Sequence, residues 1–233
     1  MTETTEIARP RPRARLIGAV WLLYLVVGGL SMLLAKGIIV QGDAAATASN
    51  LLAHAALFRT SASIDLLGNC IYIALTVLLY GLFRGVDRDL PLLAAFFSLV
   101  GCTVQIVGGL LRLAPPIVLM DPRLSGAFNV QQVQAAALFN IAMYTAVFQI
   151  SFVLFAFFDI TLGVLILKSR FLPKFFGWVF IVGGAGWLAY TWLPALASVR
   201  MVVFAIGGAA ELLLMLWLMA KGVDERYWPG PTG

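Results

Sequence analysis

Long apolar segments separated by short polar stretches dominate the chain. A membrane-spanning helix needs about 20 consecutive apolar residues. Six segments reach this length, at roughly 16–36, 61–83, 90–111, 146–167, 175–193 and 199–220. The pattern therefore predicts an all-α polytopic membrane bundle of six transmembrane helices. We expect residues 16–223 to form this membrane domain, between a basic cytoplasmic tail of residues 1–15 and a second cytoplasmic tail of residues 224–233.

The stretch GDAAATASNLLAHAALFR, residues 42–59, is too polar to span a membrane and too regular for a slack loop. Apolar and polar residues separate at helical spacing, with Leu51, Leu52, Ala55 and Phe58 on one face and Thr47, Asn50 and His54 on the other. Asp43 suits the N-cap, and Arg59 suits the C-terminal end of the helix dipole. We predict an amphipathic helix on the outer surface between the first two spans, with Asp43, Asn50, His54 and Arg59 as its polar residues.

Other helix ends carry similar signals. Asp89-Leu90-Pro91 is typical of an N-cap followed by an early proline, and Leu172-Pro173-Lys174 has the same form. Asn129 can cap a helix that runs through three glutamines into the fourth span. The connections before the two prolines are short, and we expect neither of them to hold a site.

Basic residues are distributed unequally between the two sides of the predicted bundle. Six spans place both termini and the connections 84–89 and 168–174 on one side. That side carries 11 of the 16 Lys and Arg residues: Arg9, Arg11, Arg13, Arg15, Arg84, Arg88, Lys168, Arg170, Lys174, Lys221 and Arg226. Short basic flanks stay in the cytoplasm, so both termini are expected inside. The net charge of +5 is then a topology signal, and we expect no nucleic-acid partner.

Polar residues form stripes along several spans. At about 100° per residue, Ser61, Asp65, Asn69, Tyr72, Thr76 and Tyr80 share one arc of the second span, and Ser98, Cys102, Gln105, Gly109 and Arg112 share one face of the third. Two interpretations of these stripes stay open. The first is a ligand site formed by Asp65, Asn69, Tyr72, Gln105, Arg112 and Gln149; the second is a structural cap and ion pair. We predict that Asp65 pairs with Arg112, with Arg59 as the competing partner.

Two further acidic residues, Asp159 and Glu211, lie deep within the fourth and sixth spans. At 1.5 Å per residue they lie about 20 and 18 Å below the outer boundary, where no span carries a basic residue. If they are close together they form a coupled pair that could serve proton transfer. The simpler interpretation is a protonated acid that hydrogen-bonds a neighbouring backbone or tyrosine.

Composition narrows the functional classes. Only 12% of the residues are charged and the mean hydropathy is +0.96, which is typical of membrane proteins. Both cysteines lie within spans, so we expect free thiols. A single histidine rules out the common histidine-rich metal and haem sites, and we find no catalytic motif. We therefore expect no metal or cofactor, and an enzyme is the least favoured class. Glycine pairs recur in four spans and predict close helix packing.

Several segments resemble one known family. GDAAATASNLL, LLYGLFRGVDRDLPLLAAFF, LGVLILKSRFLPKFFG and ELLLMLWLMAKGV are similar to bacterial membrane proteins that share the domain of unknown function 4386. The similarity extends from about residue 16 to residue 223, and GDAAATA is its most specific part. The resemblance implies a multi-pass protein of the bacterial plasma (inner) membrane with helices in this order. It implies no activity.

Three hypotheses for function follow. The first is a protein that binds or senses a small apolar molecule or a membrane lipid in an outward-facing cavity lined by the second, third and fourth spans. The second is a proton-coupled transporter for a small solute that uses Asp159 and Glu211. The third is a structural or partner-binding membrane protein without a ligand. The polar stripes favour the first hypothesis, and the absence of a proline at the middle of any span argues against the second.

Overall fold

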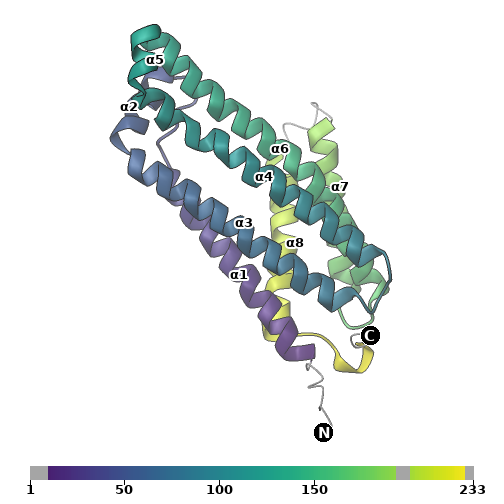
Figure 1. Ribbon diagram of the computed structural model, residues 1–233. Helices are drawn as coiled ribbons and strands as arrows, with labels where there is room; N and C mark the ends of the chain where they lie inside the picture. The colour runs from purple at the N-terminus through teal and green to yellow at the C-terminus, as the bar shows by residue number, and fades with distance from the viewer. Residues whose placement is uncertain (1–9, 193–199, 229–233) are drawn as a thin grey trace. The chain divides into compact units, whose positions relative to one another are not determined.

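The computed structural model describes residues 10–192 and 200–228, and this part of the chain is all-helical. Its elements are α1 (Pro10–Ala35), α2 (Ala44–Ala53), α3 (Ala55–Phe83), α4 (Leu90–Met120), α5 (Pro122–Ala127), α6 (Val130–Lys168), α7 (Lys174–Trp192), α8 (Arg200–Ala220) and the short 3₁₀ helix η2 (Glu225–Tyr227) (Figure 1). The described parts of the two predicted tails, residues 10–15 and 224–228, belong to α1 and to the segment around η2. The remainder of both tails lies outside the described residues.

Four of these helices, α1, α3, α4 and α6, are long and apolar enough to cross a membrane. The helices α7 and α8 are equally apolar, but their described apolar parts are shorter, at Lys174–Ala189 and Ala205–Ala220. Helix α6 has 39 residues, or about 58 Å at 1.5 Å per residue, which exceeds a hydrocarbon core of about 30 Å. Helix α6 therefore includes the predicted fourth span and, as expected from the Asn129 cap, begins well before residue 146.

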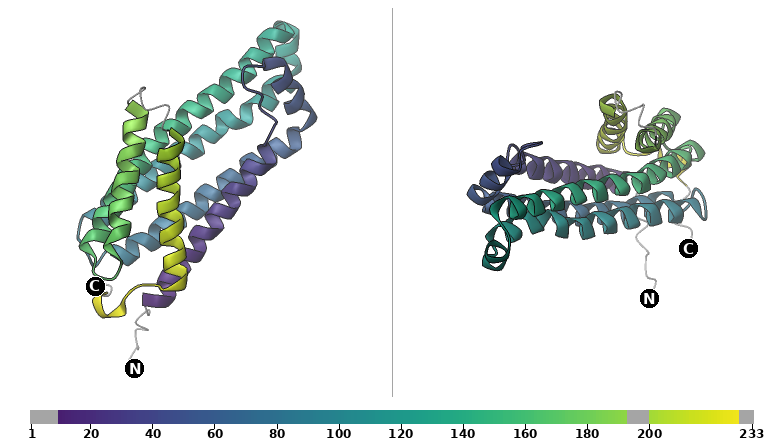
Figure 2. Two further views of the ribbon diagram at one scale, coloured as in Figure 1. Left: turned by 180° about the vertical axis from the view of Figure 1, so that it is seen from behind. Right: turned by 90° about the horizontal axis from the view of Figure 1, so that it is seen from above.

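The chain divides into two compact units, and four helices contribute residues to both. Unit 1 comprises residues 1–22, 73–100 and 152–233, and unit 2 comprises residues 23–72 and 101–151. In unit 1, α7 packs against α8, and the two helices lie side by side in both views of Figure 2. In unit 2, the last part of α4 and the first part of α6 run side by side and are joined by α5 (Figure 1).

Glycines set the closest helix contacts of unit 1. A Cβ atom at Gly163 of α6 would lie 2.6 Å from the carbonyl oxygen of Gly177 of α7, so the two backbones touch. The adjacent glycines of α7 face different neighbours. Gly183 lies against Gly207 of α8, whereas a Cβ atom at Gly184 would lie 2.6 Å from the Ala156 carbonyl oxygen of α6. Close packing was correctly predicted for these pairs.

The glycine pair of α1 behaves differently. A Cβ atom at Gly28 or Gly29 would meet no described atom within 4 Å. The prediction of tight packing was therefore wrong for this pair. Its local sequence is like that of the packed pairs, so the sequence alone does not show which glycines have a close neighbour.

Helix α2 begins as predicted and ends earlier. The side chain of Asp43 accepts a hydrogen bond from the backbone N–H of Ala46 at 2.8 Å, which makes it the N-cap. The helix ends at Ala53, with the exposed His54 as C-cap, and α3 begins one residue later. Arg59 therefore lies in α3 and does not stabilise the C-terminus of α2. The prediction of one helix over residues 43–59 was wrong because the helical spacing of apolar residues continues through the break.

The predicted polar face of α2 binds the preceding loop. The Thr47 hydroxyl accepts from the backbone N–H of Val40 at 3.0 Å and donates to its carbonyl at 3.1 Å, and Thr47 is 1% exposed. The Asn50 amide donates to the carbonyls of Gly37 and Ile38, both at 3.3 Å. These bonds satisfy backbone amide and carbonyl groups of the preceding loop. Because Thr47 binds the loop directly, its side chain is buried and does not face solvent. Leu52, assigned to the apolar face, is 49% exposed.

The starts of α4 and α6 are capped by side chains. Asp89 stands at the N-cap position of α4 as predicted, and its backbone carbonyl accepts from the N–H of Leu93 at 2.9 Å. The side chain that accepts the N–H of Leu90, at 3.1 Å, is however that of Asp87. At the start of α6, the Asn129 side chain accepts from the N–H of Gln132 at 2.9 Å, and the Gln132 side chain accepts from the N–H of Asn129 at 3.0 Å. This reciprocal arrangement is a capping box and confirms Asn129 as the cap.

Candidate functional site

Asp65 of α3 and Arg112 of α4 form an ion pair in unit 2, as predicted. The side chain of Arg112 is 11% exposed and that of Asp65 is 31% exposed, so water screens the pair only partly. Arg112 also donates to the hydroxyl of Ser61 at 2.9 Å. The backbone carbonyl of Ser61 in turn accepts from Ser31 of α1 at 2.9 Å. One cation therefore connects polar groups from three helices.

Aromatic rings complete the surroundings of Arg112. Its guanidinium carbon lies 5.6 Å from the ring centroids of both Phe58 and Tyr144, a cation–π distance. Arg59, the predicted competitor for Asp65, instead donates to the sulfur of Met120 at 3.8 Å. The ion-pair partner and both cation–π partners of Arg112 are therefore residues of this chain.

The other residues of the hypothesised ligand site do not converge on this pair. Asn69 donates to the backbone carbonyl of Asp65 within its own helix at 3.0 Å. Tyr72 is buried, with its ring 4.8 Å from that of Tyr24. Gln105 donates to the hydroxyl of Ser151 at 3.0 Å. Gln149 of α6 is exposed.

The same two stripes also meet in unit 1. Thr76 of α3 and Ser98 of α4 are hydrogen-bonded, with their hydroxyl oxygens 2.6 Å apart, and both residues are buried. The predicted stripes therefore face one another in each unit. Hydroxyl pairs of this kind connect helices inside membranes.

Asp159 of α6 and Glu211 of α8 are close enough for their charges to interact. Asp159 is 4% exposed, and Glu211 is half-buried. The indole N–H of the fully buried Trp21 of α1 donates to a carboxylate oxygen of Glu211 at 3.4 Å. A Cβ atom at Gly184 of α7 would lie 3.2 Å from the Cβ of Asp159. Four helices of unit 1 therefore surround this acid pair.

No cation compensates the acid pair within the part of the chain that the structure describes. The ion pairs there involve other groups: Arg11 with Glu225, Arg112 with Asp65, Lys168 with Asp87 and Arg226 with Asp224. Two carboxylates that interact without a cation repel one another when both are ionised, and protonation of either one relieves the repulsion. The arrangement can therefore hold a proton.

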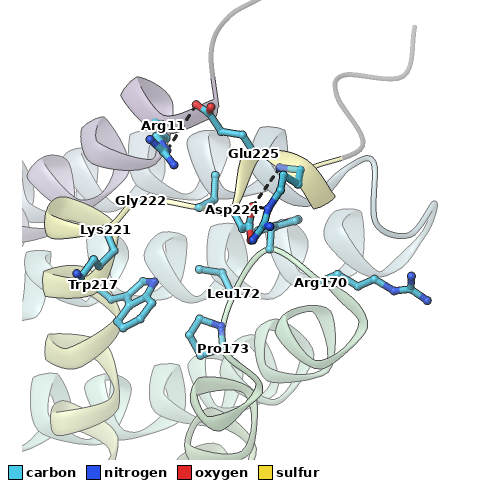
Figure 3. A pocket seen from close by; sticks show the side chains of 12 residues that line it. Arg11, Arg170, Leu172, Pro173, Trp217, Lys221, Gly222, Asp224 and Glu225 are labelled. Atoms are coloured by element: carbon cyan, nitrogen blue, oxygen red, sulfur yellow. Dashed lines mark hydrogen bonds and ion pairs between the residues drawn. The ribbon is translucent and has the colours of Figure 1, made fainter.

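The structure also contains a pocket that the sequence did not indicate. A cavity of about 590 Å³ lies in unit 1 between the connection of α6 to α7 and the segment after α8 (Figure 3). Arg170, Phe171, Leu172 and Pro173 line it, so the connection that was expected to hold no site forms one wall of a cavity. The connection is short, as expected, but the C-terminal segment folds against it and supplies the second wall.

The C-terminal segment is held in place by several contacts. Gly222 has a φ of +70°, the left-handed conformation that ends α8 and turns the chain back. Beyond the turn, the backbone N–H of Asp224 donates to the carbonyl of Phe171 at 3.1 Å. The Trp228 indole N–H donates to the carbonyl of Leu82 at 3.4 Å. The Arg226 guanidinium forms two hydrogen bonds with Asp224 and lowers the pKa of that carboxyl.

A last ion pair joins two connections of unit 1. Lys168, at the end of α6, donates to Asp87 at 2.5 Å, between α3 and α4. The hydrogen bond from Lys168, together with those from the backbone N–H groups of Leu90 and Asp89, lowers the pKa of Asp87 to about 2. The sequence showed both charges on one side of the bundle but did not pair them.

The long apolar helices are typical of membrane proteins. The chain belongs to the family described as Domain of unknown function (DUF4386), whose model matches residues 16–222. The resemblance stated from the sequence is thereby confirmed. No curated protein and no solved structure matches the chain.

Proposed function

We propose that the protein is a six-span bacterial plasma-membrane protein with both termini in the cytoplasm, and that it couples a proton to the movement of a small solute through Asp159 and Glu211. The observation that carries the proposal is the acid pair. One carboxylate of α6 and one of α8, whose charges interact, lie in an apolar bundle and have no ion-pair partner among the described residues. Ionisable groups are costly inside a membrane and mark proton or substrate pathways.

The alternative ligand site between α3 and α4 has less support. A ligand that used Arg112 would have to displace Asp65 and Ser61, and it would then leave Asp65 without its cation. Asn69 and Gln105 bond to separate partners, and Gln149 is exposed. Asp159 and Glu211, in contrast, have no ion-pair partner among the described residues.

Infrared difference spectroscopy of the purified protein tests whether the pair holds a proton. As the pH is raised, we expect the band of a protonated carboxyl group to disappear. Asp159→Asn and Glu211→Gln should each change this band, because each removes one member of the pair. Asp65→Asn is the matched control, because it also removes a carboxyl group from an apolar helix. Asp65 is paired with Arg112, so this variant should leave the band unchanged. A band unaffected by either acid-pair variant would refute proton binding there.

Coupling to a solute is a separate question. In proteoliposomes with a trapped pH-sensitive dye, we expect some members of a panel of small solutes to drive proton movement in the wild type. The same solutes should drive none in Asp159→Asn. If the acid pair binds a proton but no solute moves protons, the pair is a sensor or a structural element and the transport proposal fails.

The orientation is tested by cysteine labelling in intact cells, after replacement of Cys70 and Cys102. Ser125→Cys in α5 should react with an impermeant reagent, and Arg88→Cys should react only after the cells are opened. Both positions are exposed, so burial does not limit the reaction. The opposite result would invert the proposed topology.

A further inference from the structure

We propose that the pocket between the α6–α7 connection and the C-terminal segment binds the phosphate-bearing headgroup of an anionic phospholipid. The pocket lies wholly in unit 1 and has a volume of about 590 Å³, within the range of small-molecule sites. The inference does not depend on the acid pair.

Charge is the first argument. Four basic and two acidic side chains line the pocket. Both acids are already neutralised, because Asp224 pairs with Arg226 at 2.8 Å and Glu225 pairs with Arg11 at 3.7 Å. Arg170 and Lys221 remain, and within the described ranges neither has an ion-pair partner. The pocket therefore presents two uncompensated cations, which suit a phosphate group.

The arrangement of these two cations is the second argument. In Figure 3, Arg170 and Lys221 lie on opposite sides of the pocket and their side chains extend away from one another, with Leu172, Pro173 and Trp217 between them. Leu172 is buried, and the ring of Trp217 packs edge-on against Phe176 with centroids 5.7 Å apart. A free phosphate ion would use the basic rim and leave this apolar floor empty. A glycerophospholipid can place its phosphate at this basic rim and its glycerol and acyl carbons over the floor.

Location is the third argument. The pocket lies at the ends of three apolar helices, because Arg11 is in the first turn of α1, Arg170 follows α6 and Lys221 follows α8. Tryptophan and basic residues at helix ends are typical of the membrane interface. Basic pockets between helices on the cytoplasmic side bind anionic lipid headgroups. The lipid source of the phosphate is therefore favoured over a soluble anion.

The test is native mass spectrometry of the full-length protein in detergent, with phosphatidylglycerol, phosphatidylcholine, glycerol 3-phosphate or inorganic phosphate added in turn. We expect phosphatidylglycerol to bind more tightly than phosphatidylcholine. Arg170→Gln combined with Lys221→Gln should weaken phosphatidylglycerol binding roughly thirtyfold, since each cation near an anionic lipid contributes about a fivefold gain in affinity. Phosphatidylcholine binding should be unchanged.

The control is Arg88→Gln combined with Lys174→Gln, which removes the same charge from exposed positions that do not line the pocket. It should retain the preference for phosphatidylglycerol. Equal loss in both double variants would mean that only net charge matters and would overturn the site. Displacement of phosphatidylglycerol by glycerol 3-phosphate or inorganic phosphate at equal concentration would identify a soluble anion as the ligand and overturn the lipid assignment.

A structural role for the two cations is distinguished by thermal unfolding. The double variant Arg170→Gln and Lys221→Gln should unfold at the temperature of the wild type without added lipid, because neither side chain bonds to the described protein. Phosphatidylglycerol should then raise the unfolding temperature of the wild type and leave that of the variant unchanged. If the variant is already destabilised without lipid and still gains stability from it, the proposal is wrong.

Discussion

The guanidinium of Arg112 in α4 is held by the carboxylate of Asp65 in α3, and this ion pair joins the polar stripes of the two helices. Removing one member leaves the other partly buried without its counter-charge, so Asp65→Asn or Arg112→Gln should each destabilise the protein by about 2–3 kcal/mol, below the range for a fully buried pair. The double variant should lose less than the sum. Thermal unfolding in detergent measures the cycle, and strictly additive losses would show that the residues are not coupled.

The contact between α6 and α7 predicts that replacing glycine by alanine has opposite effects on stability at two positions. Gly163→Ala should destabilise the protein by about 1–3 kcal/mol, because its Cβ would lie 2.6 Å from a backbone oxygen that cannot move without shifting a helix. Gly28→Ala is the control. No described atom lies within 4 Å of its added Cβ, and alanine favours the helix by about 1 kcal/mol. Unfolding temperatures should therefore move in opposite directions, and equal shifts would contradict the packing.

The ion pair between Asp87 and Lys168 predicts that the stability of the fold depends on pH in the acidic range. The folded pKa of Asp87 is about 2, below the ordinary value of 3.8, so the unfolded state takes up a proton first as the pH falls. The stabilisation is fully present above pH 3.8 and is lost as the pH falls through about 2. Unfolding temperatures of the wild type and of Asp87→Asn should converge across this window. A difference that persists below pH 2 would show that Asp87 acts by something other than its charge.

The capping box of α6 makes a local prediction. Asn129→Ala removes the acceptor for the N–H of Gln132 and should cost about 1 kcal/mol. Hydrogen exchange should accelerate in the first turn of α6 and stay unchanged at Leu162, which is buried in the same helix. Asn129→Asp keeps the acceptor and should exchange as slowly as the wild type. Faster exchange along the whole helix would indicate that the cap also controls global stability.

The long helices were predictable because apolar length and capping chemistry are both local properties of the sequence. Asp43 and Asn129 were correctly assigned as caps, and the ion pair of Asp65 with Arg112 followed from two facing stripes. Helix ends were harder to predict. Residues 112–120 continue α4 beyond the predicted span, because a helix can extend past the hydrocarbon core and the length of an apolar segment indicates only the part inside it.

The errors at the candidate sites have a different cause, because they depend on contacts between distant segments. The burial of Thr47 follows from its bonds to a loop seven residues earlier. The basic pocket depends on the chain after Gly222 turning back to the connection at Phe171. Neither arrangement leaves a periodic signal. The proximity of Asp159 and Glu211 likewise required the packing of α6, α7 and α8, which residue depth alone does not give.

The two adjacent glycines of α7 have a consequence for the acid pair. Gly183 contacts α8 and Gly184 contacts α6, the helices that carry Glu211 and Asp159 respectively. Helix α7 has no carboxylate, yet it contacts both helices that do, and at each contact its surface is bare backbone. A methyl group at either position would press against one acid-bearing helix and leave the contact with the other unchanged. The closeness of α7 to each of these helices is therefore set by residues that carry no side chain at all.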